Sequence, residues 1–175
     1  MTLLTKAQSL NVYRWIGKQI ANNMIIREAS ELDIHAIYDL WAVERSPADT
    51  SCDCQRATRW VGLISGNHAG FVELVRNSAD SAWGGHWLYS LWVRTRWRGF
   101  GLGEKLVRAV VERSQVEGSD KLDLMVYEDN TRVVCLYHKL GFMHITFSEI
   151  EALLLSEQQT SGRRRIVMRK WLGGN

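Results

Sequence analysis

A glycine-rich segment, Arg98-Gly99-Phe100-Gly101-Leu102-Gly103, separates an apolar run from an amphipathic one. The apolar run covers residues 86–93, and after the glycines Leu102, Leu106 and Val110 recur at helical spacing. A turn that opens a helix leaves several backbone N–H groups free, and the helix dipole adds partial positive charge there. Glycines let the backbone approach an anion without a Cβ in the way. The segment is therefore predicted to bind a phosphate or a pyrophosphate.

The spacing of the glycines narrows the choice of phosphate ligand. A dinucleotide-binding turn requires G-x-G-x-x-G, but Glu104 occupies the third glycine position. A Walker loop requires G-x-x-x-x-G-K followed by Ser or Thr, and this segment does not supply it. What remains is an R-x-x-G-x-G pattern that follows a strand ending in Leu91-Trp92-Val93.

A second segment combines a strand with a helix that carries a tyrosine. Residues 121–127 are predicted to form the strand, and residues 131–140 the helix. Asn130 suits the N-cap position of this helix, and Gly141 suits the C′ position that ends it. The chain thus contains two consecutive strand–helix units, one opened by glycines and the other by an asparagine.

Together the two segments resemble the GCN5-related N-acetyltransferase (GNAT) superfamily. The string N-T-R-V-V-C-L-Y-H-K-L-G-F resembles the family's N-x-x-A-x-x-L-Y-x-x-x-G-F segment, with Val133 for the usual Ala, and R-x-x-G-x-G resembles its acyl-CoA signature. The layout is most similar to that of ribosomal-protein-alanine N-acetyltransferases, and the resemblance covers roughly residues 24–171. It implies an α/β (α+β) GNAT fold. Such a fold has a mixed, mostly antiparallel sheet of six to seven strands, about four flanking helices, and splayed central strands.

The resemblance also implies the roles of the site residues. Acetyl-CoA would be the cosubstrate, with its pantetheine arm in the gap between the splayed strands and its pyrophosphate on the glycine turn. Tyr137 would stand beside the thioester sulfur as the general acid, because a phenol of pKa ~10 is protonated at neutral pH. The predicted cofactor-binding residues are Leu91, Trp92, Val93, Arg98, Gly99, Phe100, Gly101, Leu102, Gly103 and Asn130.

The implied reaction moves an acetyl group to a primary amine by direct attack in a ternary complex. The acceptor is either a peptide N-terminus or a small-molecule amine. Where relatives often carry carboxylates, this chain has Trp87 and Met125, so the general base stays open. The candidates besides a chain of waters are Glu73, His86, Tyr89 and Glu128.

The missing carboxylates motivate a different class of function. A domain that binds acyl-CoA without turnover, as a sensor or scaffold, would keep the glycine turn and need no base. The presence of Tyr137 argues against this alternative.

Periodicity and turn residues predict the elements that position these groups. An amphipathic helix is expected over residues 3–21, within an N-terminal extension of residues 1–23 that could mediate homodimer formation. A single domain is expected over residues 24–175, and Ser30 with Asp33 resembles a capping box. The other predicted elements are strands 24–29, 70–77, 86–95, 121–127, 142–150 and 163–172, and helices 31–43, 55–64 and 131–140, besides the helix after the glycine turn. The connection 151–162 is expected to cover the acceptor site.

Bulk composition fits one soluble catalytic domain. A chain of 175 residues with 46% hydrophobic content can bury one core. No apolar run approaches the ~18 residues that span a bilayer, and the N-terminus lacks secretory signal features. A cytoplasmic location without a membrane partner is therefore expected, with reduced thiols. Cys52 and Cys54 are the only close cysteine pair and the histidines are scattered, so we expect no metal.

The charge distribution is modestly basic. The formal net charge is +3, and arginines gather at Arg94, Arg96 and Arg98 and again over residues 163–165. A nucleic-acid-binding patch would use such clusters with tryptophans as stacking platforms. Solvated strand ends explain the second cluster more simply, and phosphate binding explains the first. No nucleic-acid partner is expected.

Overall fold

The computed structural model of the chain describes residues 19–20, 23–44, 57–78 and 83–173. Most of the predicted N-terminal helix over residues 3–21 therefore lies outside the described residues. The strands are β1 (Met24–Glu28), β2 (Ala57–Ile64), β3 (Asn67–Asn77), β4 (Gly85–Val93), β5 (Lys121–Tyr127), β6 (Met143–Ile145) and β7 (Arg165–Trp171). The helices are α2 (Glu31–Glu44), α3 (Leu102–Val116), α4 (Thr131–Lys139) and α5 (Ser148–Ser161), with a short 3-10 turn η1 (Thr95–Trp97).

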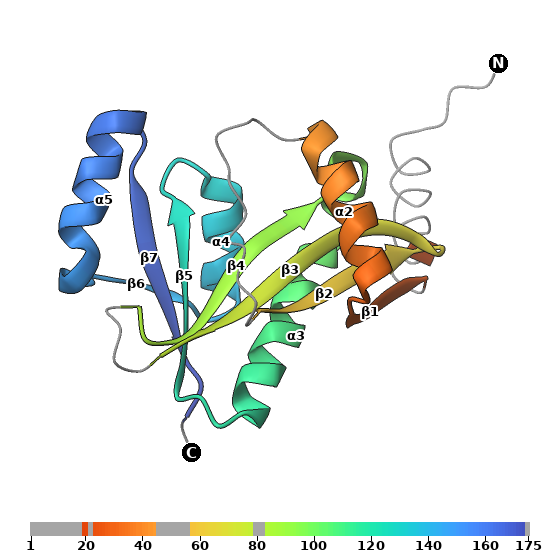
Figure 1. Cartoon of the computed structure of the whole chain (residues 1–175), viewed down its shortest axis with the longest axis horizontal. Coiled ribbons are helices and arrows are strands. Elements are labelled where there is room, and N and C mark those ends of the chain that lie inside the picture. The colour runs from red at the N-terminus through yellow and green to blue at the C-terminus, as the bar shows by residue number, and fades with distance from the viewer. Residues whose placement is uncertain (1–18, 21–22, 45–56, 79–82, 174–175) are drawn as a thin grey trace, which may run out of the picture.

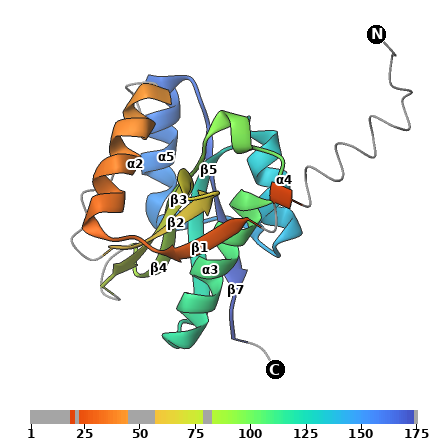
Figure 2. The ribbon, with the colours of Figure 1, turned by 90° about the vertical axis from the view of Figure 1, so that its right-hand side faces the viewer.

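The strands form one mixed sheet in the order β1-β2-β3-β4-β5-β7-β6. All neighbouring strands are antiparallel except β4 and β5, which run parallel. Helices α2 and α5 lie on one face of the sheet and α3 and α4 on the other (Figure 1, Figure 2). The predicted mixed sheet with flanking helices is confirmed.

The predicted helix over residues 55–64 is wrong, because this stretch forms β2 from residue 57 onward. The second half of the strand, from Trp60 to Ile64, is continuously buried between β1 and β3. A short apolar run has no periodicity that separates a buried strand from a buried helix. The aromatic and β-branched residues Trp60, Val61 and Ile64 favour the strand.

The C-terminal region also differs from its prediction. Strand β6 is shorter than the predicted strand over residues 142–150, and the expected connection 151–162 is mostly helix α5. Ile150 and Leu154, one helical turn apart, pack on Trp87 and hold α5 to the sheet. Three successive leucines at 153–155 hide this spacing in the sequence.

The predicted capping box at the start of α2 is confirmed. The Asp33 Oδ2 atom accepts a hydrogen bond from the Ser30 backbone N–H at 2.8 Å, and Ser30 Oγ accepts one from the Asp33 N–H at 3.3 Å. The Arg27 guanidinium donates two further hydrogen bonds to Asp33 and, as the largest cause, holds the pKa of that carboxyl well below its usual range. Strand β1 is thereby tied to the helix that follows it.

Strands β4 and β5 pair over a short distance and then part. His86, Trp87 and Leu88 are opposite residues 122–124, and no pairing of the two strands continues beyond them in the described sheet. The predicted splay of the central strands is therefore confirmed. Because β5 is not paired there, the backbone at the end of β4 is open on that side.

A bulge in β4 sets the direction of the side chains beyond the parting. Ser90 has φ +53°, and the β3–β4 register shifts at this point. As a result Trp92 packs on the α2 face, whereas Leu91 and Val93 pack toward α3. The left-handed backbone of a non-glycine residue is strained, and such strain occurs where a site requires it.

Gly70 brings β3 against the end of β4. A Cβ at this position would lie 2.6 Å from the Trp92 carbonyl oxygen and 3.3 Å from a methyl carbon of Leu106 on α3. Backbone on one side and a buried helix on the other leave no space for a side chain. The end of β4 depends on this close approach for its position.

The C-terminal end of α3 is clamped to the sheet by Glu117. Its carboxylate accepts hydrogen bonds from Arg76 of β3 at 2.6 and 2.7 Å and from Arg113 at 2.6 Å, while Arg113 also reaches Glu28 of β1 at 3.0 Å. The Arg76 guanidinium is the largest cause that lowers the pKa of Glu117 to about 2. His86 lies 3.6 Å from the same carboxylate, and burial lowers the pKa of its imidazole.

Replacing Gly70 by alanine is expected to destabilise the protein by about 1–3 kcal/mol, because β4 must shift to accept the methyl group. Gly173→Ala is the matched control, since a Cβ there meets nothing within 4 Å. Urea unfolding of both variants measures the difference. Equal stabilities for the two would show that the close approach at Gly70 is not required.

Stability is expected to fall as the pH drops from neutral toward 2. Glu117 has a lower pKa in the folded protein, about 2, than in the unfolded chain, 4.5. Its ionised form therefore contributes its full stabilisation above pH 4.5, and this contribution is lost as the pH falls toward about 2. The lowered pKa of His86 acts in the same direction from its unfolded value of 6.5 downward. Unfolding free energies at pH 7, 4 and 2.5 test this, and Glu117→Gln should flatten the lower part of the curve. A Glu117→Gln curve parallel to that of the unchanged protein would contradict the assignment.

Candidate active site

A cleft of about 450 Å³ opens where β4 ends and the first turns of α3 and α4 meet. It lies at the parting of β4 from β5, so it combines open strand backbone with two helix N-termini. Nine of the ten predicted cofactor-binding residues line it, and Phe100 is the exception. The lining residues are Leu91, Trp92, Val93, Trp97, Arg98, Gly99, Gly101, Leu102, Gly103, Glu104, Asn130, Arg132, Val133, Leu136 and Lys139.

The glycine turn forms one end of the cleft. Gly99 and Gly101 have φ of +91° and +86°, a backbone region in which other residues are strained. Gly101 precedes α3, and the first helical hydrogen bond runs from the Lys105 N–H to the Gly101 carbonyl at 3.1 Å. The N–H groups of residues 102–104 therefore have no acceptor within the helix. This geometry suits an anion.

Two arginines face this anion site in different ways. Arg98 donates a hydrogen bond from Nε to the Val93 carbonyl at 2.9 Å, so part of its guanidinium is used by the last backbone carbonyl of β4. Arg132 lines the cleft and has no ion-pair partner among the described residues. Sequence reasoning missed Arg132, although a cation in the first turn of a helix opposes the helix dipole and so hints at a nearby anion. Arg132 lies close to the glycine turn, since a Cβ built on Gly99 would be in ordinary contact with its guanidinium at 3.5 Å.

Glu104 is the acidic side chain among the lining residues. It accepts hydrogen bonds from Lys139 at 2.6 Å and from Arg108 at 2.9 Å, and Lys139 is the largest cause that lowers its pKa. These two cations offset the charge that Glu104 would otherwise present to a bound phosphate. The pair with Lys139 also joins α3 to α4 across the cleft.

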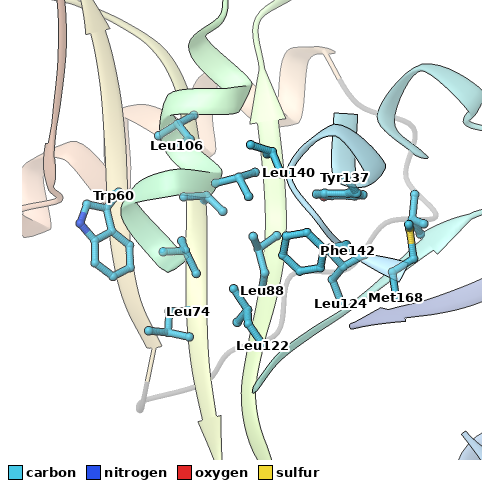
Figure 3. Packing of buried hydrophobic residues seen from close by; sticks show 14 of the residues in the cluster. Trp60, Leu74, Leu88, Leu106, Leu122, Leu124, Tyr137, Leu140, Phe142 and Met168 are labelled. Atoms are coloured by element: carbon cyan, nitrogen blue, oxygen red, sulfur yellow. The ribbon is translucent and has the colours of Figure 1, made fainter. Parts of the chain in front are cut away.

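Tyr137, the predicted general acid, is buried on the inner side of α4. Its side chain is 4% exposed, and its ring lies 5.5 Å from that of Phe142 (Figure 3). Burial raises the pKa of its phenol above the ordinary value, so the hydroxyl is protonated throughout the neutral range. Tyr137 does not line the cleft, whereas Val133 and Leu136 of the same helix do.

The ends of α4 follow the sequence prediction in part. Gly141 has φ +85°, and the Phe142 N–H donates to the Tyr137 carbonyl at 3.0 Å, as expected for a glycine that ends a helix. Asn130 occupies the N-cap position and lines the cleft, but its side chain makes no capping hydrogen bond. The Asn130 amide is thus not used by the helix.

The structure separates the four candidates for the general base. His86 lies in the Glu117 clamp, far along β4 from the cleft, and Glu128 is exposed beside Arg164 at 3.5 Å. Glu73 and Tyr89 instead lie opposite each other on β3 and β4, next to the bulge at Ser90. Neither side chain lines the cleft, but Tyr89 lies two residues before Leu91, which does.

Neither a metal-ligand cluster nor a membrane-spanning helix is found among the described residues. No group of three or more His, Cys, Asp or Glu side chains there could hold a metal ion. Cys52 and Cys54 lie outside the described residues. None of the described helices is long and apolar enough to cross a membrane.

The chain is similar in sequence to curated proteins that are named as acetyltransferases. The chain is 34% identical over 71 residues to thialysine N-epsilon-acetyltransferase of Bos taurus. The aligned stretch covers 39% of this chain and 42% of that protein. The matched stretches span less than half of the curated relatives' length.

Two solved structures share the fold. The ribosomal-protein-S18-alanine N-acetyltransferase of Escherichia coli superimposes with a TM-score of 0.65 at 19% identity, over 87% of this chain and 96% of that one. The Salmonella typhimurium protein yncA, solved with its cofactor acetyl-CoA, superimposes with a TM-score of 0.62 at 18% identity, over 87% and 96%. The model of the acetyltransferase (GNAT) family matches residues 26–142. The chain therefore belongs to the acetyltransferase (GNAT) family.

Proposed function

We propose that this chain transfers an acetyl group from acetyl-CoA to a primary amine by direct attack in a ternary complex. The observation that carries the proposal is the cleft at the parting of β4 and β5, where open strand backbone and two helix N-termini converge. Arg132 also lines it and has no ion-pair partner among the described residues. The cationic and backbone donors suit the phosphates, and the apolar residues Val133 and Leu136 suit the pantetheine arm.

The chain holds the cosubstrate in two parts. The N–H groups of residues 102–104 bind the pyrophosphate at the positive end of the α3 dipole, and Arg132 adds a charged donor. The backbone of Leu91–Val93 binds the amides of the pantetheine arm as an added strand would, because β5 does not pair there. Asn130 contributes its free side-chain amide to the same arm.

Tyr137 serves the departing thiolate. Full proton transfer from a phenol of pKa ~10 to a thiolate of pKa ~8.5 is uphill by about 2 kcal/mol, and burial of the phenol adds to this. Tyr137 therefore strengthens a hydrogen bond to sulfur as the C–S bond breaks, and completes the transfer late. Its ring is already fixed in orientation by Phe142.

The acceptor is a peptide α-amine or a small-molecule amine. The Escherichia coli fold relative is named for an alanine of a ribosomal protein and the Bos taurus relative for the side-chain amine of thialysine. Both acceptors present a primary amine that is protonated at neutral pH. Removing that proton at pH 7 costs about 4–5 kcal/mol for an alkylamine of pKa ~10.4 and about 1 kcal/mol for a peptide α-amine of pKa ~7.8, so a base in the site assists the alkylamine most.

A second candidate function is acyl-CoA binding without turnover. The observation that favours it is the burial of Tyr137 outside the lining of the cleft. The two functions differ in one property: the enzyme loses turnover when the hydroxyl is removed, whereas a sensor has none to lose.

Arg132→Ala is expected to weaken acetyl-CoA binding by about 1 kcal/mol, or roughly fivefold in Kd, because an exposed charge contact to phosphate is lost. Arg164→Ala is the matched control, since Arg164 is half-exposed and lies outside the cleft. Calorimetric titration with acetyl-CoA measures both, with NAD as a ligand that should not bind. No acetyl-CoA binding by the unchanged protein would overturn the proposed function.

Tyr137→Phe is expected to lower kcat by at least 100-fold while Tm and acetyl-CoA affinity stay unchanged, because only the hydroxyl is removed from a packed ring. Thiol release from acetyl-CoA in the presence of thialysine, or of a hexapeptide beginning with alanine, gives the rate. Unchanged kcat in the variant would remove Tyr137 from the mechanism. Tight acetyl-CoA binding with no amine-dependent thiol release in the unchanged protein would favour the sensor.

A further inference from the structure

A row of polar side chains crosses the sheet beside the bulge in β4. Arg59 of β2, Glu73 of β3 and Tyr89 of β4 are direct register partners, so their side chains lie on the same face. This is the face covered by α2 and α5 (Figure 2), because Phe71 on the same strand packs with Ile37 of α2. The row therefore lies on the opposite face of the sheet from α3 and α4.

Glu73 is fully buried and only half satisfied. Its Oε1 atom accepts a hydrogen bond from Nε of Arg59 at 2.7 Å, with the Glu73 residue 0% exposed. Its Oε2 atom is buried and has no hydrogen-bond partner in the described part of the molecule. A buried carboxylate oxygen without a donor is costly, and native structures rarely retain one without a reason.

A second buried carboxylate–arginine pair in the same sheet has hydrogen bonds to both of its carboxylate oxygens. Asp123 of β5 is also 0% exposed and is the register partner of Arg169 of β7. Arg169 donates to both carboxylate oxygens, at 2.7 and 2.8 Å. A cross-strand arginine can thus satisfy a buried carboxylate fully in this sheet, and Arg59 does not do so for Glu73.

Glu73 does not line the cleft itself, but its register partner on β4 lies two residues before a residue that does. Tyr89, opposite Glu73, directly precedes the bulge residue Ser90, and Leu91 is the first β4 residue that lines the cleft. Two residues along a strand span about 7 Å, and neighbouring strands are about 4.8 Å apart. An amine or an amine with one water bridges such a distance. No strand pairing between β4 and β5 is present here in the described sheet, so an amine that enters between them would meet Glu73 from the α2–α5 face.

We propose that the free oxygen of Glu73 receives the ammonium group of a cationic primary amine and takes one of its protons. An ammonium carries three donors and no acceptor, which is the complement of an orphan carboxylate oxygen. Arg59 holds the carboxylate in place through the other oxygen. This inference rests on the proposed acetyl transfer and assigns its acceptor subsite.

The step balances without a further reactant. Glu73 takes one proton from the ammonium nitrogen and passes it to solvent, and the freed lone pair forms the C–N bond to the acetyl carbon. The C–S bond breaks with its electron pair on sulfur. The nitrogen then loses its second proton to water, and the thiolate gains a proton from the Tyr137 hydroxyl, which takes one back from water. The products are the amide, the free thiol and one proton.

The test compares Glu73→Gln with Asp123→Asn, because both remove the charge of a buried carboxylate that is paired with an arginine across strands. Glu73→Gln should lower kcat with thialysine or the alanine hexapeptide by at least 100-fold. Asp123→Asn should keep kcat within about threefold, even though it loses a bidentate pair and Tm falls. Acetyl-CoA affinity should be unchanged in Glu73→Gln.

Glu73→Asp and Arg59→Gln separate catalysis from folding. Glu73→Asp keeps the charge and should restore part of kcat. Arg59→Gln should lower kcat while acetyl-CoA affinity stays unchanged, because the carboxylate loses the group that holds it in place. The groups facing Glu73 are Arg59, Tyr89 and, through its contact with Arg59, Tyr38 of α2.

Full activity of a folded Glu73→Gln protein would overturn the inference while leaving the proposed function intact. Equal losses in Glu73→Gln and Asp123→Asn would overturn it as well, since both would then reflect stability. If the unchanged protein binds acetyl-CoA but releases no thiol with either amine, acetyl transfer to these amines fails and the role of Glu73 fails with it. If it does not bind acetyl-CoA, the proposed function itself is wrong.

Discussion

The parting of β4 from β5 is the constraint on which the site depends. Parallel pairing ends at Leu88, and the bulge at Ser90 then turns the rest of β4 away from its neighbour. Backbone groups that a continuous sheet would use internally are left for a ligand. The cost of unsatisfied backbone is offset when a strand-like ligand pairs with it. Gly70 lets β3 support the displaced strand closely enough to keep it in place.

Electrostatics in the cleft come from backbone as much as from side chains. Helices α3 and α4 both begin at the cleft, so the positive ends of two helix dipoles face the same volume. Arg132 lies at the N-terminal end of α4, where the helix dipole disfavours a cation. A bound anion would offset this repulsion. Glu104 is held by Lys139 and Arg108, so the helix start keeps its acidic residue without opposing that anion.

The sheet contains two buried carboxylate–arginine pairs that serve different purposes. Asp123 and Arg169 satisfy each other and join β5 to β7. Glu73 and Arg59 join β2 to β3, but the second carboxylate oxygen of Glu73 is buried and has no hydrogen-bond donor among the described residues. Buried ion pairs are weak evidence for stability, and an incomplete one is weaker still. The incomplete pair lies next to the bulge, and the complete pair lies where β4 and β5 remain paired.

The sequence by itself determined the two motif segments, the family and the order of most elements, because glycine turns, helix caps and helical periodicity are local properties. It could not separate strand from helix at residues 57–64, since a short buried apolar run carries no distinguishing period. It also missed α5, because the three successive leucines at 153–155 hide the helical spacing of Ile150 and Leu154. Only the tertiary structure decided which groups meet. It placed Arg132 in the cleft, buried Tyr137 against Phe142, and set Glu73 beside the bulge, because strand register and long-range packing are not encoded in any one segment.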